Sequence, residues 1–359
     1  MVTIVFAYRN REVSRIKISL DSLQNQNNQN FKVVFVDYGS ESKLADQILK
    51  LVQSYSFSSY YYVPTHLLLW NKSKALNYGI TKAETPYVFI ADVDIVFHAN
   101  TITLFQNIAN LDKAYLFKLG YLDKKVSENL KKSYVFEDLK PKHFGTVNGM
   151  ILIAKEALVK INGFDTFFHF YGSEDVDLYE RIKNAGYEIV NNESHYFYHN
   201  HHVIYNSYND KEMSVVPRLY NIKRINEEHY LINKAEKLIV PHNQGTFGEI
   251  VSIEGQDYLK NPDKVIRLYN IHAHVHHFFN EHLKTFKNKV VQVVIEEDEY
   301  CQSMKYFLKE LFKKNSQPYL SMKAVNDLVL MKILYDYKDF NYAYLIADNL
   351  KKITFTIKL

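Results

Sequence analysis

The N-terminal part of the chain predicts an α/β fold, with a mostly parallel sheet and helices on both of its faces. Short apolar runs at residues 3–8, 31–36 and 87–91 are typical of buried strands. The segments between them place apolar residues at helical spacing, as in residues 13–23. Regular alternation of strands and helices is the pattern of a parallel sheet covered by helices.

The same periodicities predict the other elements in order. Strands are expected at residues 3–8, 31–36, 60–63, 87–91, 187–190 and 195–198. Helices are expected at residues 13–23, 42–52, 72–81, about 102–109, 155–161 and 175–184. Gly186 suits the left-handed conformation that often follows a helix C-terminus. Ligands of such sheets bind beyond the carboxyl ends of strands, so polar residues there are candidate site residues.

The length of 359 residues exceeds one typical core and predicts a large domain with a smaller one. The strand–helix pattern changes beyond about Val215. We therefore expect the large domain at residues 1–214 and a smaller region, mixed or mainly helical and of unknown role, at residues 215–359.

Composition limits the partners. The formal net charge is only +4 and the basic residues are scattered, which argues against a nucleic-acid partner. The single cysteine, Cys301, excludes an internal disulfide and favours a reducing compartment. No apolar run approaches the roughly 20 residues of a membrane helix. We expect a cytoplasmic protein, with peripheral contact at the inner face of the membrane left open because an acceptor could be lipid-linked.

Asp92 and Asp94 directly follow a predicted buried strand. Side chains two residues apart in an extended chain point the same way, so both carboxylates can reach one ion. Mn²⁺ and Mg²⁺ favour oxygen ligands and bind through one or two carboxylates together with substrate phosphates. An Asp-x-Asp pair alone is weak evidence, but its place at a strand end predicts a metal site.

The segment 171–177 places Glu174, Asp175 and Asp177 at the start of a predicted helix. A helix N-terminus favours negative charge, so these residues taken alone are explained equally well as a capped helix start without catalytic function. Gly172 leaves room for a bulky ligand, and a carboxylate crowded by like charges can act as a base. His199, His201 and His202 follow the last predicted strand, where an imidazole could complete a metal shell.

Five motifs occur in a characteristic order along the chain. They are the opening Tyr-Arg-Asn-Arg, the strand that ends in Asp, the Asn-rich helix, the Asp-Val-Asp and the Asn-Gly-Phe before Glu-Asp, at residues 8–12, 33–40, 70–79, 91–94 and 161–175. Together they resemble family-two-like glycosyltransferases of the GT-A fold. They resemble most the metal-dependent galactosyltransferases and the N-acetylgalactosaminyltransferase domains of bacterial polysaccharide synthases.

The resemblance implies that about residues 1–98 bind a nucleotide-sugar donor and about 99–214 carry the acceptor and catalytic part. Arg9 and Asp37 would hold the uridine, and Lys74 would lie near the donor phosphates. Asp92 would reach the ribose and the metal, and Asp94 would ligate the metal directly. The cofactor implied is Mn²⁺ or Mg²⁺.

On the acceptor side, the resemblance implies that Asp175 is the catalytic base and that Glu174 holds the acceptor or donor sugar. Tyr171 stands where the family has a Trp that stacks on the acceptor, next to Gly172. His199 would complete the metal shell, with His201 as the second choice. The implied reaction is an inverting transfer from a UDP-sugar to an acceptor hydroxyl, in surface polysaccharide or glycoconjugate synthesis. The acceptor would be a saccharide or a lipid-linked saccharide.

Two other functions remain open at this point. A metal-dependent nucleotidyltransferase would also use paired Asp residues, although it should carry a glycine-rich phosphate loop, which residues 8–11 lack. A non-catalytic nucleotide-sugar-binding protein is the second alternative. Further along, His272, His274, His276 and His277 could form another metal site, but we favour one face of a structural element.

Overall fold

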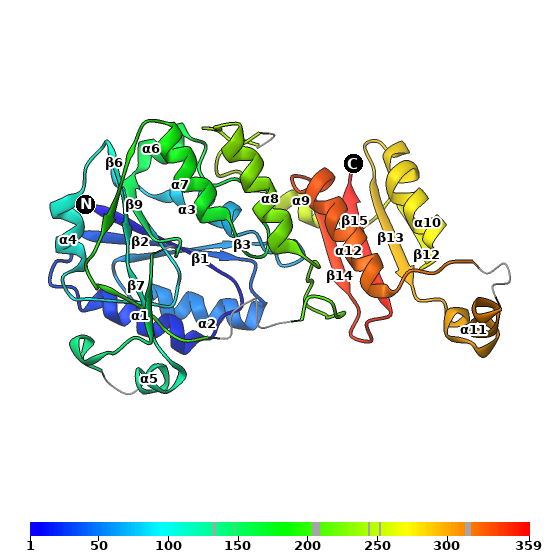
Figure 1. Ribbon diagram of the computed structural model, residues 1–359, viewed down its shortest axis with the longest axis horizontal. Helices are drawn as coiled ribbons and strands as arrows, with labels where there is room; N and C mark the ends of the chain where they lie inside the picture. Colours follow the sequence, from blue (N-terminus) through cyan, green and yellow to red (C-terminus); the bar gives the residue numbers. More distant parts are fainter. Residues whose placement is uncertain (132–133, 147, 203–208, 243–244, 251–252, 313–316) are drawn as a thin grey trace. The chain divides into compact units, whose positions relative to one another are not determined.

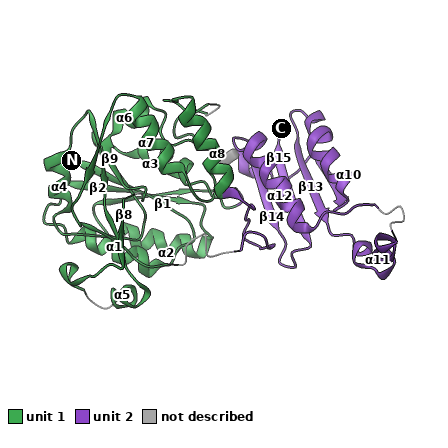
Figure 2. Ribbon diagram, in the orientation of Figure 1, with its two compact units in different colours: residues 1–66, 70–207, 223–250 green, residues 67–69, 208–222, 251–359 purple. Residues whose placement is uncertain are grey.

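The computed structural model describes residues 1–131, 134–146, 148–202, 209–242, 245–250, 253–312 and 317–359. The chain forms two compact units (Figures 1 and 2). The first contains residues 1–66, 70–207 and 223–250, and the second contains residues 67–69, 208–222 and 251–359. Residues 223–250, which the sequence placed in the C-terminal region, therefore belong to the first unit.

The first unit is built on a seven-stranded sheet of order β10-β6-β9-β4-β1-β2-β3. Its strands are β1 Val2–Tyr8, β2 Phe31–Tyr38, β3 Ser58–Val63, β4 Tyr87–Ala91, β6 Lys113–Phe117, β9 Ile151–Ala154 and β10 Glu188–Asn192. All pairs are parallel except those of β9, which runs antiparallel to β4 and β6. The expected α/β architecture with a mostly parallel sheet is confirmed.

Eight helices belong to the described part of this unit, and six of them cover the two faces of the sheet. They are α1 Val13–Gln24, α2 Ser42–Gln53, α3 Lys72–Lys82, α4 Thr101–Ile108, α5 Lys124–Asn129, α6 Lys155–Lys160, α7 Glu174–Asn184 and α8 Ile222–Ala235. Buried side chains of α1, α2 and α4 share one core cluster with the sheet, and those of α3, α6 and α7 share the other.

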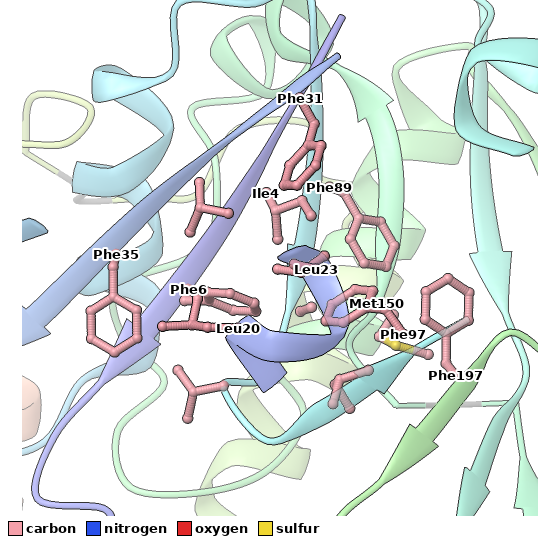
Figure 3. Close-up of a cluster of buried hydrophobic side chains, with 14 of the residues drawn as sticks. Ile4, Phe6, Leu20, Leu23, Phe31, Phe35, Phe89, Phe97, Met150 and Phe197 are labelled. Atoms are coloured by element: carbon pink, nitrogen blue, oxygen red, sulfur yellow. The ribbon is translucent and has the colours of Figure 1, made fainter. Parts of the chain in front are cut away.

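Alternation along β1 builds these two cores. Ile4 and Phe6 point to one face, where Leu20 of α1 packs in the cluster shown in Figure 3. Val5 points to the other face, into the cluster that contains Leu76 of α3. Because both faces are covered, the parallel strands are apolar almost throughout, which explains the short apolar runs in the sequence.

A second, four-stranded sheet of order β5-β11-β7-β8 lies in the same unit. Its strands are β5 Ile95–Phe97, β7 Leu119–Tyr121, β8 His143–Gly145 and β11 Phe197–His199. β11 pairs antiparallel with β5 and parallel with β7, which brings His199 opposite both Ile95 and Tyr121. Segments that are about a hundred residues apart in the chain are thus joined next to Asp94.

The second unit is mixed, with a four-stranded sheet of order β12-β13-β15-β14. Its strands are β12 Lys264–Tyr269, β13 Val290–Glu296, β14 Tyr342–Ile346 and β15 Lys352–Lys358. Its helices are α9 Ile253–Tyr258, α10 His272–His277, α11 Met304–Leu311 and α12 Met322–Lys332. None of the helices in the described parts of the chain has the length and apolarity that crossing a bilayer would require.

Candidate active site and metal centre

The carboxyl ends of β1, β2 and β4 meet at one edge of the large sheet. In the strand register, Tyr8 lies opposite Asp37, and Phe6 lies opposite Ala91. The residues that follow these strands are therefore neighbours, as parallel pairing requires. Arg9 and Asp92 are placed at this edge by the ends of β1 and β4.

Asp94, His199 and His202 form a metal trio, as we call these three residues. Oδ1 of Asp94 lies 3.5 Å from Nε2 of His199, and Oδ2 lies 3.4 Å from Nε2 of His202. One ligand atom from each residue lies within 4.8 Å of the others. Among the described residues this is the only group of three or more side chains that could hold a metal, so the histidines of α10 form no second one.

Strand pairing explains why these residues meet. The antiparallel pairing of β11 with β5 sets His199 opposite Ile95, the residue after Asp94. The Asn200 amide then donates to the Asp94 carbonyl oxygen at 3.0 Å. Beyond β11 the chain is no longer in a strand, so the two-residue alternation ends and His202 faces Asp94. His201, the second choice from the sequence, is exposed, and its amide donates to Oγ of Ser127.

The donor set of the trio fits a divalent metal. One carboxylate and two imidazoles are common ligands of first-row divalent ions, and three protein ligands leave positions for a substrate. Atoms bound to one ion at about 2.1 Å lie at most about 4.2 Å apart, so small side-chain adjustments suffice. Nη1 of Arg15 on α1 is buried without a hydrogen-bond partner in the described structure and lies 3.6 Å from Oδ2 of Asp94. Three basic side chains, Arg15, His199 and His202, thus lie around the Asp94 carboxyl group.

Asp92 contacts a lysine that the sequence analysis did not single out. Oδ1 of Asp92 lies 2.7 Å from Nζ of Lys72, at the first residue of α3. Burial would raise the pKa of Asp92, but the Lys72 ammonium and charges on His199 and His202 together bring it below its usual value. Asp92 thus lies near both histidines, although it is not one of the three residues of the metal trio.

Lys72 also reaches the start of α7. Its Nζ lies 3.7 Å from Oε1 of Glu174. Burial lowers the pKa of Lys72, but Asp92 and Glu174 outweigh it and leave the pKa above its usual value. Lys74, predicted near the donor phosphates, is instead buried, and its amide donates to Oδ1 of Asn71, the N-cap of α3. Two residues separate these lysines, about 200° around the helix axis, so their side chains leave α3 on different sides.

Glu174 and Asp175 begin α7 and lie in different environments. Burial raises the pKa of Glu174, and Asp175 adds to the rise, while Lys72 opposes it. Oδ1 of Asp175 accepts the amide of Val176 at 2.8 Å. Both side chains are partly buried, so α7 presents two adjacent carboxylates next to Lys72 and Asp92.

Asp177, the third carboxylate of this helix start, points away into the core. Its Oδ2 accepts Nε of Arg181 at 2.8 Å, and its Oδ1 accepts Nδ2 of Asn233 at 2.8 Å. Asn233 and His229 of α8 also reach Oδ2 of Asp165, at 3.2 and 2.8 Å. This buried polar network joins α7, α8 and the segment before α7, and explains why α8 belongs to the first unit.

The segment between α6 and α7 is held by asparagines of α3. Nδ2 of Asn77 donates to the Phe164 carbonyl, and Oδ1 of Asn77 accepts the Phe164 amide, both at 2.8 Å. Nδ2 of Asn71 donates to the Thr166 carbonyl at 2.8 Å. The Asn-rich helix thus fixes the segment that leads to Tyr171.

Tyr171 and Gly172 form the turn that precedes α7. Gly172 has φ of 102° and Ser173, the N-cap, has φ of 70°, a region that glycine adopts easily and serine rarely does. Two residues of α8 contact Tyr171. Nδ2 of Asn226 donates to the Tyr171 carbonyl, and Nζ of Lys223 lies 5.9 Å from the centre of the Tyr171 ring. Tyr171 remains exposed, as an acceptor contact would require.

Arg9 and Asp37 lie together at the ends of β1 and β2. Oδ1 of Asp37 accepts the Ser40 amide and Oδ2 accepts the Tyr60 hydroxyl, both at 2.8 Å. Burial raises the pKa of Asp37, and its hydrogen bonds and the Arg9 charge oppose the rise. Nη2 of Arg9 donates to the His66 carbonyl at 2.6 Å.

The sequence analysis assigned no role to three residues of the site, Arg15, Lys72 and Tyr121. It named His202 as a candidate but preferred His199 and then His201 as the metal ligand. The Tyr121 ring stacks on His143 with centroids 4.8 Å apart and contacts His199 at 5.4 Å. Two of the four lay close to residues that the sequence had singled out. Lys72 is two residues before Lys74, and His202 belongs to the same run of histidines as His199.

Comparison with known proteins agrees with this architecture. Residues 3–160 match the model of glycosyl transferase family 2, and residues 133–203 match the one described as the N-terminal domain of galactosyltransferase. A search of curated proteins found no match.

The chain is also similar to parts of several solved structures. One is TarS 1–349 of S. aureus, with 16% identity, a TM-score of 0.43, and coverage of 55% of this chain and 60% of that one. Another is the mannosyltransferase PcManGT from Pyrobaculum calidifontis in complex with GDP-Man and Mn²⁺, with 18% identity, a TM-score of 0.42, and coverage of 68% and 65%.

A third is GalNAc-T7 with UDP, GalNAc and Mn²⁺, with 11% identity, a TM-score of 0.40, and coverage of 56% of this chain and 43% of that one. The chain thus spans less than two thirds of each of these three structures. Likeness of this extent identifies neither a donor nor an acceptor. Residues 3–160 thus match a glycosyl transferase family 2 domain, carried on the mostly parallel α/β sheet of the first unit.

Proposed function

We propose that the chain is an inverting, metal-dependent transferase that moves galactose or N-acetylgalactosamine from a UDP-sugar to an acceptor hydroxyl. The observation that carries the proposal is the metal trio beside the two carboxylates that begin α7, at the sheet edge where ligands of such folds bind. Synthesis of a surface polysaccharide or glycoconjugate is the proposed setting, with a saccharide or lipid-linked saccharide as acceptor.

On the donor side, Arg9 and Asp37 would hold the uridine and Lys72 would face the diphosphate. The metal trio would hold the ion, and its imidazoles favour Mn²⁺ over Mg²⁺, which prefers an all-oxygen shell. Bound there, the ion would supply Lewis-acid neutralisation of the charge on the leaving diphosphate. Asp92, which neighbours both the trio and Lys72, would position the donor between them.

On the acceptor side, Asp175 takes the proton of the acceptor hydroxyl. The acceptor oxygen forms a bond to the anomeric carbon from the face opposite the diphosphate, and the bond from that carbon to UDP breaks. UDP leaves with the electron pair, and one displacement inverts the anomeric centre. Glu174, which lies against Lys72, would hold the acceptor or donor sugar. Tyr171, which is exposed at the turn before α7, would contact the acceptor sugar.

The test is a screen of UDP-sugars for UDP release with Mn²⁺, Mg²⁺ or EDTA, with and without saccharide acceptors. We expect metal-dependent UDP release from UDP-galactose or UDP-N-acetylgalactosamine. NMR of the product should show the anomeric configuration opposite to that of the donor. A retained configuration would exclude the single displacement, and activity that is unchanged in EDTA would exclude the metal role.

The same screen separates the two alternatives. A nucleotidyltransferase would release pyrophosphate from UTP with a sugar phosphate and leave UDP-sugars intact. A non-catalytic binding protein would show a UDP-dependent rise in thermal stability without turnover. The paired carboxylates beside Lys72 favour the transferase, because a binding module has no need of two adjacent partly buried acids.

A further inference from the structure

The short helix α11 in the second unit carries its apolar side chains on the outside. Met304, Phe307, Leu308, Leu311 and Phe312 at its end are each between 44% and 72% exposed. None of the helix's own residues is buried. An exposed contiguous apolar face of this kind is unusual on a soluble domain and marks an interaction site.

The helix is attached to its unit by the opposite, polar side. The Tyr306 ring lies between Tyr300 and Tyr319, at centroid distances of 5.9 and 5.2 Å. The Tyr306 hydroxyl donates to the Gln317 carbonyl at 3.2 Å. With about 100° between successive residues, Tyr306 lies across the helix from Met304, Leu308 and Leu311. An ordinary surface helix is oriented the other way, with its apolar face toward the core.

One lysine borders the exposed apolar face. Lys305 is exposed next to Phe312 on the helix surface, whereas Nζ of Lys309 lies 5.8 Å from the centre of the Tyr300 ring, on the attached side. Glu310 is the one acidic residue of the helix, and it accepts the Tyr306 hydroxyl at 3.3 Å on the attached side. The outward face is therefore apolar with a basic margin, the distribution of helices that lie in the interface of an anionic bilayer.

The size of the face argues against a second copy of the chain as its partner. A helix of eight residues is about 12 Å long and about 10 Å wide. A stable protein interface buries about 800 Å² on each partner, several times what this face can supply alone. A bilayer needs no complementary surface, since insertion depends on apolar side chains and nearby basic residues.

We propose that α11 is a membrane-contact helix, whose apolar face enters the headgroup region of a bilayer that carries anionic lipid. The inference does not depend on the proposed transfer reaction, because it rests on the second unit alone. It gives that unit a role, namely to bring the chain to a lipid surface.

The test is co-sedimentation of the full chain with phosphatidylcholine vesicles, with and without added phosphatidylglycerol, and without donor or metal. We expect binding to the anionic vesicles that weakens as salt is added. The double variant Phe307→Ser, Leu311→Ser should reduce binding about tenfold or more, since each removes a large apolar group from the interface. Lys305→Glu should reduce binding about fivefold or more, because each basic residue near an anionic surface contributes about that factor.

The matched control is Leu231→Ser with Ile232→Ser, a pair of exposed apolar residues on α8. This control should bind as the unchanged chain does. Absence of vesicle binding by the unchanged chain, or equal loss in the control pair, would overturn the proposal. So would a dimer in light scattering that the α11 pair converts to monomer without any vesicle binding. If the double variant fails to fold, Lys305→Glu alone decides, because it replaces an exposed side chain.

Discussion

The ammonium of Lys72 joins two carboxylates from different elements: it lies 2.7 Å from Asp92 and 3.7 Å from Glu174. Asp92 follows β4 and Glu174 begins α7, so this one cation links the donor edge of the sheet to the proposed acceptor side. Two partly buried carboxylates that share one ammonium would repel each other without it.

Replacing Lys72 by Met should therefore lower kcat/KM for transfer about a hundredfold, by removing a positioned positive charge from a partly buried site. Lys72→Arg should retain more activity, because it keeps the charge. The comparison is Lys74→Met, since Lys74 is the lysine that the family resemblance places near the phosphates. Greater loss in Lys74→Met than in Lys72→Met, with both variants folded, would restore that assignment.

Asp94→Ala should abolish the metal dependence of UDP binding. Asp94 supplies the one carboxylate of the metal trio, and both histidines approach its oxygens. Transfer should fall by about a thousandfold or more, because metal ions contribute several kcal/mol to such transition states. Titration calorimetry with UDP, with and without Mn²⁺, measures the effect. An unchanged Mn²⁺ dependence in this variant would remove Asp94 from the site.

His202→Ala should weaken Mn²⁺ binding by at least about tenfold, as loss of a ligand to a three-residue site predicts. His201→Ala is the matched control, because the His201 side chain is next in sequence to His202 but is exposed and lies outside the trio. Metal-dependent thermal shift of both variants provides the measurement. If His201→Ala is the damaging change, residues after β11 take another path in solution.

Asp175→Asn should reduce turnover by about a hundred- to ten-thousandfold, because the amide cannot accept the acceptor proton. Donor and metal affinity should hardly change. Glu174→Gln should chiefly raise KM, since Glu174 is proposed to hold a sugar. The raised pKa of Glu174 makes it the competing base. Near-normal turnover of Asp175→Asn together with an inactive Glu174→Gln would show that Glu174 is the base.

Asp165→Asn should destabilise the first unit by about 1–3 kcal/mol, since it disrupts a buried network with His229 and Asn233. Burial raises the pKa of Asp165, but the His229 contact outweighs it and the pKa is lowered. A lowered pKa stabilises the fold above the unfolded value of about 3.9, and this stability is lost as pH falls below it. Denaturant unfolding at several acidic pH values should show a smaller pH slope in the variant.

Asp177 is the internal comparison for this pH effect. Burial raises its pKa, so it contributes a slope of the opposite sign in both proteins. Because the Asp165 charge is one cause of that raised pKa, Asp165→Asn is compared with its parent in an Asp177→Asn background, which isolates Asp165. An identical acid slope in the two proteins would show that the ionised Asp165 does not stabilise the fold.

Local sequence patterns were enough to predict the parallel sheet and the elements that carry the site. Strands buried on both faces must be apolar and helices between them must be amphipathic, so both leave a local pattern. The predicted strand at residues 87–91 is β4, and the predicted helix at residues 175–184 is α7 from its second residue. Asp94 and Glu174 could be singled out because they follow or begin such elements.

Which neighbours of these residues face the site depends on how the elements pack together. The sequence periodicity does not resolve whether Lys72 or Lys74 of α3 faces the site, because this depends on how the helix is rotated about its axis. Nor does it resolve whether His201 or His202 does so, because this depends on where β11 ends. The place of Asp177 depends on Arg181 and on Asn233, which lies in a helix the sequence had assigned to another region. The contact with Asn233 joins residues 56 positions apart in the chain. Its free energy depends on the burial of both residues together, which leaves no signal in either segment alone.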